Sequence, residues 1–164
     1  LDGQTLAERL EDGPLTAELL PVVMRQIGDG LQALHAAGII RRELAPRFVL
    51  LRNPDDSVVL TEFELAKLLD GSPSVSAGWP DDPYRAPEVK GGHVTQAADV
   101  YSWGRIFLES ASGDLPPQGR ESDRVHRTQL PKSVRSILES SLRPLPSDRP
   151  QSMDVVMRAL RRWW

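Results

Sequence analysis

The chain has 164 residues, of which 40% are hydrophobic and 26% are charged, a composition typical of a single globular domain. Its formal net charge of −3 offers no electrostatic basis for binding nucleic acid, and the absence of cysteine excludes disulfides and thiolate chemistry. No apolar run approaches the roughly 18 residues that a membrane-spanning helix requires, and no signal peptide is visible. These features favour a cytoplasmic protein without a membrane span.

Hydrophobic periodicity predicts two helices in the first part of the chain. Residues 1–13 carry leucines at helical spacing and end in an Asp-Gly-Pro sequence, which stops a helix. A longer helix is expected over residues 15–37, or from Pro21 onward, because its apolar side chains recur on one face. His35 lies near its end with no partner at metal-ligand spacing, so we expect a structural histidine.

The next segment carries the signals of a β-hairpin followed by a loop. Two short apolar runs, residues 49–51 and 57–60, flank an Asn-Pro-Asp-Asp sequence that is typical of a turn between two strands. Residues 70–83 are rich in Gly, Pro, Ser and Asp, which predicts a loop. We therefore expect one hairpin, and no long strand, in this part of the chain.

The second half of the chain is predicted to be mainly helical. Apolar residues on one face predict helices over residues 133–142 and 152–164. A further helix over residues 97–110 is expected from the resemblance of its Asp-Val-Tyr-Ser-Trp-Gly sequence to a motif described below. Residues 111–130 are polar and contain several Gly and Pro, so a helix in this range is expected to be short or missing.

Five motifs, in order along the chain, resemble those of the eukaryotic-type Ser/Thr protein kinases. Residues 41–48, Arg-Arg-Glu-Leu-Ala-Pro-Arg-Phe, resemble the catalytic loop of that family, written His-Arg-Asp-Leu-x-x-x-Asn. The other four are the Asp-Phe-Gly-like stretch at 62–67, the Ala-Pro-Glu sequence at 86–88, the Asp-Val-Tyr-Ser-Trp-Gly sequence at 99–104 and the Arg-bearing loop at 144–150. The resemblance implies a mainly α fold: a kinase-like C-lobe over residues 1–164, a helical bundle with one or two short β-hairpins. We expect the family's N-lobe to be absent from this chain and an activation-segment-like loop at about 62–88.

The resemblance also implies that the residues bearing the chemistry are replaced. Glu43 stands at the position of the catalytic Asp, Phe48 at that of the metal-binding Asn, and Glu62 at that of the magnesium-binding Asp. Glutamate is one methylene longer than aspartate, and a misplacement near 1 Å can cost on the order of a hundredfold in rate. A phenyl ring has no lone pair for a metal. We therefore expect no catalytic residue, no metal, no cofactor and no ATP.

Three further positions match residues that hold the kinase fold together. Glu88 and Arg149 match the partners of a buried ion pair beneath the activation segment. Asp99 matches the acid that accepts hydrogen bonds from the backbone of the catalytic loop. These matches imply structural roles, and none of them argues for catalysis.

Arg42 allows three interpretations. Asp81 or Asp82 could form a permanent carboxylate clamp with Arg41 and Arg42, or a phosphate added to a nearby serine could bind Arg42. The third interpretation is a polar loop with unpaired surface arginines. The candidate serines are Ser72, Ser74 and Ser76.

Four aromatic residues are candidates for an interaction surface. Trp79 lies beside a proline in the predicted loop, and Phe48 is expected on the face that an N-lobe covers in the family. Trp163 and Trp164 follow several arginines and form a basic-aromatic tip. This tip could dock on a partner, a neighbouring domain or a membrane surface, or pack against the preceding helices.

The leading functional hypothesis is a non-catalytic pseudokinase C-lobe that serves as a protein-interaction or regulatory scaffold, with a protein partner or neighbouring domain. One alternative is a weak, atypical Ser/Thr kinase completed by an N-lobe from elsewhere, with Glu43 as a degraded base and Glu62 as a metal ligand. The other alternative is a purely structural spacer domain.

Overall fold

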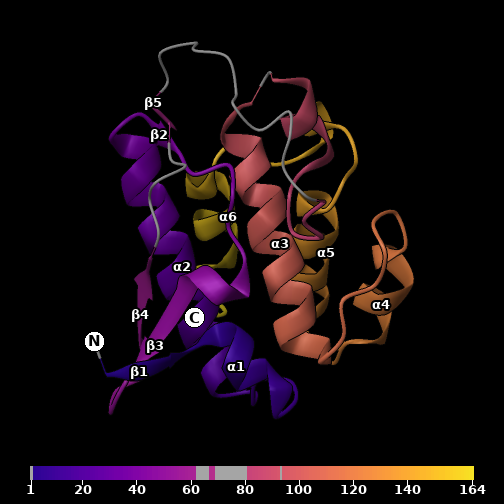
Figure 1. Ribbon diagram of the computed structural model, residues 1–164. Helices are drawn as coiled ribbons and strands as arrows, with labels where there is room; N and C mark the ends of the chain where they lie inside the picture. The colour runs from indigo at the N-terminus through magenta and orange to yellow at the C-terminus, as the bar shows by residue number, and fades with distance from the viewer. Residues whose placement is uncertain (1, 62–66, 69–80, 93) are drawn as a thin grey trace.

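The structure is a computed structural model that describes residues 2–61, 67–68, 81–92 and 94–164. Helices form most of the body, and a small sheet packs along α2 (Figure 1). In these residues the α-helices are α1 (Leu6–Glu11), α2 (Leu19–Ala36), α3 (Gln96–Ser112), α4 (Glu121–Arg127), α5 (Lys132–Ser141) and α6 (Met153–Leu160). The strands are β1 (Gly3–Thr5), β2 (Ile39–Ile40), β3 (Val49–Arg52), β4 (Ser57–Leu60) and β5 (Lys67–Leu68). None of the helices described is both long enough and apolar enough to span a bilayer.

The predicted mainly α fold with a short hairpin is confirmed, and the hairpin is part of a larger sheet. Strands β3 and β4 pair antiparallel, with Val49 opposite Leu60, as the apolar runs around the Asn-Pro-Asp-Asp turn predict. Strand β1 adds to the other edge of β3, giving the order β1-β3-β4. Strands β2 and β5 form a separate antiparallel pair that the sequence did not predict. The predicted short helix in the polar region is α4, with seven residues.

The prediction of one helix over residues 1–13 is wrong for its first part. Helix α1 begins only after Thr5, whose hydroxyl accepts a hydrogen bond from the Glu8 N–H at 3.1 Å. The Glu8 carboxylate accepts in turn from the Thr5 N–H at 2.7 Å, which completes a capping box. Residues before this cap extend along β3, and a Cβ on Gly3 would lie 2.2 Å from the Leu51 carbonyl oxygen. Glycine is therefore the residue that allows this strand pairing.

Two other helices are shorter than their predicted ranges. Helix α2 begins at Leu19, whose N–H donates to the Thr16 hydroxyl at 3.3 Å. Residues 15–18 therefore precede the helix, although the apolar pattern predicted a start at residue 15 or at Pro21. It ends before Gly38, which adopts a left-handed conformation with φ of 75°. Helix α6 ends at Leu160, and the last residues turn back toward the core.

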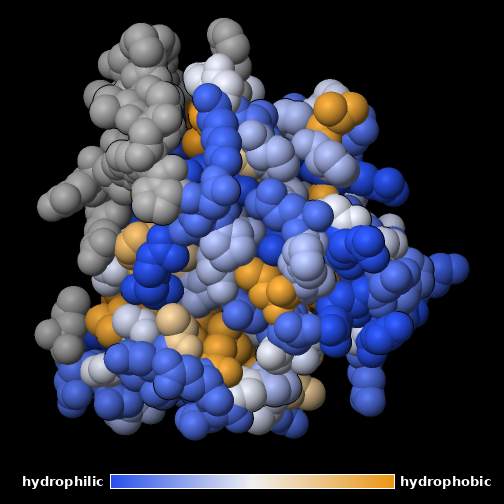
Figure 2. Space-filling model, turned by 45° about the vertical axis from the view of Figure 1, so that its right-hand side comes forward, coloured by the Kyte–Doolittle hydropathy of each residue, from blue (hydrophilic) through white to orange (hydrophobic). Residues whose placement is uncertain are grey.

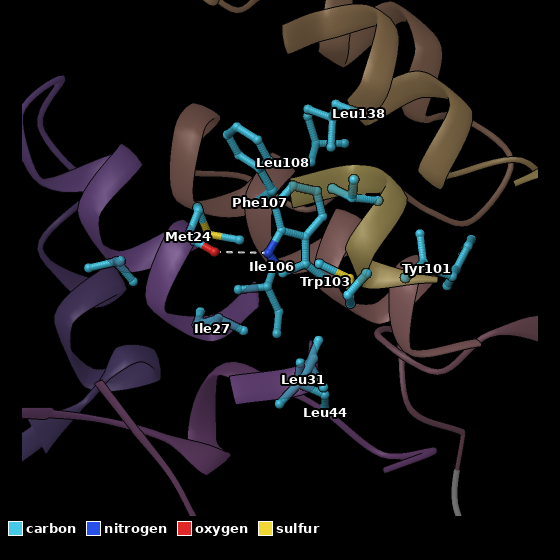
Figure 3. Packing of buried hydrophobic residues seen from close by; sticks show 14 of the residues in the cluster. Met24, Ile27, Leu31, Leu44, Tyr101, Trp103, Ile106, Phe107, Leu108 and Leu138 are labelled. Atoms are coloured by element: carbon cyan, nitrogen blue, oxygen red, sulfur yellow. Dashed lines mark hydrogen bonds between the residues drawn. The ribbon is translucent and has the colours of Figure 1, made fainter. Parts of the chain in front are cut away.

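Helix α3 forms the centre of the hydrophobic core. Its side chains are buried on all sides, which is typical of a helix surrounded by other elements (Figure 3). Trp103 is fully buried, packs edge-on against Phe107 with ring centroids 5.1 Å apart, and donates its indole N–H to the Met24 carbonyl at 3.1 Å. This hydrogen bond satisfies the polar atom of a buried tryptophan and ties α3 to α2.

A core truncation tests this packing. Leu31→Ala removes a fully buried side chain of α2, and we expect it to lower the free energy of unfolding by about 2–5 kcal/mol because a cavity remains. Leu145→Ala is the matched control, since Leu145 is 60% exposed, and its cost is expected to stay within about 0.5 kcal/mol. Urea denaturation measures both values, and equal costs would contradict the placement of Leu31 in the core.

Candidate functional site

A single buried carboxylate, that of Asp99, holds the loop that resembles the kinase catalytic loop. Asp99 lies in the first turn of α3 and accepts hydrogen bonds from the backbone N–H groups of Arg41 at 2.9 Å and Arg42 at 2.8 Å. His35, at the end of α2, places its Nε2 2.8 Å from the same carboxylate. His35 therefore has a structural partner, and the loop is tied to two helices at one point.

Arg42 is buried beside this carboxylate in an unusual backbone conformation. Its φ of 67° is left-handed, which is uncommon for a residue other than glycine and costs of order 1 kcal/mol. The side chain is only 9% exposed, and its Nε and Nη1 atoms have no hydrogen-bond partner among the described residues. The arginine is therefore part of the interior of the loop and not a free surface charge.

The predicted clamp between the acids Asp81 and Asp82 and the arginines Arg41 and Arg42 is wrong, because both acids bind other cations. Asp82 pairs with Arg47, and Asp81 pairs with the exposed Lys90. Asp81 and Lys90 both lie within residues 81–92, whereas Arg47 comes from the short 3₁₀ helix at Pro46–Phe48. The other proposed partners of Arg42, the three serines, lie outside the described residues.

Glu43, which the kinase resemblance predicts to stand at the position of the catalytic Asp, takes part in an ion pair. Its side chain is 9% exposed and binds the guanidinium of Arg85, which is itself buried. Burial raises the pKa of Glu43 above its ordinary value, and the nearby Arg85 only partly offsets this effect. The carboxylate is therefore directed at a neighbouring side chain.

Phe48, which the kinase resemblance predicts to stand at the position of the metal-binding Asn, lies in a short 3₁₀ helix and has two arginines near its ring. The guanidinium of Arg47 lies 4.3 Å from the ring centroid and that of Arg41 lies 5.8 Å from it, both within cation–π range. Arg41 also donates to the Thr61 carbonyl, which anchors it at the end of β4. Glu62 lies outside the described residues. In the described part of the chain, no group of three or more acidic or histidine side chains could hold a metal ion.

Glu88 and Arg149 form a bidentate ion pair, with distances of 2.7 and 3.0 Å. Arg149 is 4% exposed and makes further hydrogen bonds to backbone carbonyls. These carbonyls belong to Arg143, Pro144 and Ala97. The pair therefore joins the Ala-Pro-Glu segment, the start of α3 and the loop before α6.

A third buried ion pair joins Arg105 and Glu121, and sequence reasoning missed both this pair and the pair between Glu43 and Arg85. Arg105 is 1% exposed and lies 2.8 Å from the Glu121 carboxylate. It also donates to the carbonyls of Pro83 at 2.9 Å and Pro116 at 2.8 Å. The sequence did contain a signal for this pair, since Arg105 lies inside the apolar run of α3. A buried charge needs a partner, so an arginine in such a run predicts one.

The C-terminal tryptophans pack against the chain itself. Trp163 stacks on Phe107 with ring centroids 5.3 Å apart, and Trp164 lies 5.2 Å from Trp163. Both are half-buried, so of the alternatives for the basic-aromatic tip this geometry matches packing against the preceding helices. Trp79 lies outside the described residues.

The family model of the protein kinase domain matches residues 1–162, so the chain belongs to the protein kinase domain family. It is 34% identical to serine/threonine-protein kinase PkaA of Streptomyces coelicolor, over 98% of this chain and 32% of that protein. It is 33% identical to serine/threonine-protein kinase PknA of Mycobacterium tuberculosis, over 79% of this chain and 33% of that protein. A third relative is the membrane-associated tyrosine- and threonine-specific cdc2-inhibitory kinase of Drosophila melanogaster, 32% identical over 77% of this chain and 26% of that protein. The chain thus spans about a third of the length of the first two relatives.

A substitution at the bidentate pair tests its structural role. Arg149→Ala leaves Glu88 without its partner, and we expect a loss of about 3–5 kcal/mol in the free energy of unfolding. Arg143→Ala removes an exposed side chain of the same loop and keeps the carbonyl that Arg149 uses, so its cost is expected to be within about 0.5 kcal/mol. Chemical denaturation compares the two variants, and similar losses would argue against the pair.

A further prediction concerns the buried carboxylate of Glu109 and how its effect on stability changes with pH. Burial raises the pKa of Glu109, whose carboxylate accepts a hydrogen bond from the Tyr84 hydroxyl at 2.6 Å. An acid with a raised pKa in the folded state stabilises the fold below its unfolded pKa and loses that contribution as pH rises. We therefore expect Glu109→Gln to gain stability relative to wild type between about pH 4 and pH 7. Chemical denaturation of both proteins at about pH 4 and pH 7 measures this change. A difference in the free energy of unfolding between variant and wild type that is the same at both pH values would refute the prediction.

Proposed function

We propose that the chain is a non-catalytic member of the protein kinase domain family and that it serves as a protein-interaction or regulatory module. The observation that carries this proposal is the buried ion pair between Glu43 and Arg85. In phosphoryl transfer the base must face the attacking hydroxyl of the substrate. A carboxylate held by a neighbouring arginine is poorly placed for that role.

The surroundings of Phe48 support the same proposal. Magnesium takes oxygen ligands, and neither the phenyl ring of Phe48 nor the guanidiniums of Arg41 and Arg47 supply one. The described residues around Phe48 therefore do not fit the magnesium that the family's fold implies. Two arginine cations beside the ring repel a metal cation at the same place.

The retained contacts are those that maintain shape. Asp99 binds the backbone of the loop, and the Glu88–Arg149 pair anchors the segment that follows residue 81. A domain that keeps its architecture while its reactive positions change is suited to presenting a surface to a protein partner or a neighbouring domain. The negative net charge supports a protein partner over nucleic acid, and a cytoplasmic location is proposed with it.

A weak Ser/Thr kinase is the second candidate. PkaA and PknA are both named as serine/threonine-protein kinases, and position 43 keeps a carboxylate. In that case Glu43 acts as a displaced base and Glu62 as a metal ligand, with the ATP-gripping parts supplied from outside residues 1–164.

Phosphate transfer by the full-length protein separates the two candidates. We expect no transfer to a general acceptor protein with ATP and magnesium or manganese, and no rise in melting temperature with magnesium and ATP. PkaA provides the matched control. Replacing its residues that match positions 43, 48 and 62 by Glu, Phe and Glu, as in this chain, is expected to abolish any transfer by PkaA. Transfer by the wild-type protein above the background of a Glu43→Ala, Glu62→Ala variant would overturn the proposal.

Complementation tests the scaffold role directly. In cells that lack the gene, Glu62→Ala removes the carboxylate expected to bind magnesium, and a non-catalytic module is expected to restore the wild-type phenotype fully. A kinase that depends on this carboxylate would restore little or none of it. Arg149→Ala serves as the control that loses rescue through loss of the fold.

A further inference from the structure

A hollow of about 480 Å³ lies at the end of the bundle where α2 begins and α3 ends, away from the kinase-like loop. Its lining comes from residues 15–20, 111–112 and 124–131 and from Trp163. This volume lies within the range of roughly 300–1,000 Å³ that is common for small-molecule sites. The face on which α4 lies is largely hydrophilic, and apolar side chains gather near its centre (Figure 2).

The floor of the hollow is apolar and fixed by the core. Leu15 and Leu20 are 6% and 5% exposed, and the Leu15 N–H donates to the Ser110 carbonyl at 2.8 Å, which ties this wall to α3. Trp163 is held by its stacking on Phe107, with an angle of 24° between the rings. The apolar surface is therefore present before any ligand arrives, which lowers the entropic cost of binding.

The rim of the hollow is cationic. Arg124 and Arg127 lie three residues apart on α4, so both face the same side of that helix. Arg124 pairs with Asp114, whereas Arg127 is exposed and has no ion-pair partner among the described residues. One positive charge at the rim is therefore uncompensated, next to an apolar floor.

This combination selects one ligand chemistry. A small inorganic anion would leave the exposed part of Trp163 uncovered, and a neutral apolar molecule would make no use of Arg127. We propose that the hollow binds a small organic acid, with an aromatic or aliphatic body on Leu15, Leu20 and Trp163 and a carboxylate paired with Arg127. This site does not depend on the proposed loss of catalysis, since none of these residues belongs to the loop around Glu43.

Calorimetric titration of the full chain with 4-phenylbutyrate tests the site. The acid is expected to bind at least about tenfold more tightly than the neutral isostere 4-phenylbutanol, because the carboxylate adds a charge-assisted contact. Acetate, which lacks the apolar body, is expected to show no measurable binding. Arg127→Ala should weaken binding of the acid by about tenfold. Arg120→Ala, an exposed arginine outside the hollow, should leave binding unchanged.

A blocking variant keeps the test independent of charge. Ala17→Trp places a large side chain at an exposed position of the lining and is expected to abolish binding without lowering the melting temperature. Equal affinities for the acid and the alcohol, wild-type affinity in Arg127→Ala, or no binding of the acid would each overturn the proposal. Binding of an acidic peptide containing phenylalanine, without binding of 4-phenylbutyrate, would also overturn it and indicate a protein ligand.

Discussion

The buried carboxylate of Asp99 is the constraint on which the kinase-like site depends. It accepts hydrogen bonds from two consecutive backbone N–H groups of the loop, which holds Arg42 in a left-handed conformation that it would otherwise leave. Because these donors belong to the backbone, the path of the loop does not require particular side chains at positions 43 and 48. The loop can therefore keep its shape while the residues that carry the chemistry of the family change.

Arginines make many of the internal connections around this loop. Arg149 and Arg105 join distant segments by binding both a carboxylate and several backbone carbonyls, and each is almost completely buried. Arg85 binds Glu43, and Arg47 binds Asp82 while it stacks on Phe48. Buried charges need partners, and Arg149, Arg105 and Arg85 each bind a glutamate carboxylate.

Local signals predicted the elements whose structure is decided locally. Helix α5 follows from apolar periodicity, and the β3–β4 hairpin follows from turn residues between two apolar runs. Helix α3 was predicted from the Asp-Val-Tyr-Ser-Trp-Gly motif that it carries. Strand β1 was mistaken for the start of a helix because its extended conformation comes from pairing with β3, far along the chain. The β2–β5 pair was missed for the same reason, since each strand has only two residues and too short a pattern to detect.

Motif spacing alone sufficed to identify the family, because a loop motif places its residues at fixed intervals along the chain. The ion-pair partners of the loop residues cannot be predicted from spacing in this way. Arg85 meets Glu43 across 42 residues, and Arg105 is matched with Glu121 only because α3 and α4 pack together. Which charges neutralise each other is therefore decided by folding, since an ion pair depends on distance in space and on exclusion of water, and neither can be read from residue order.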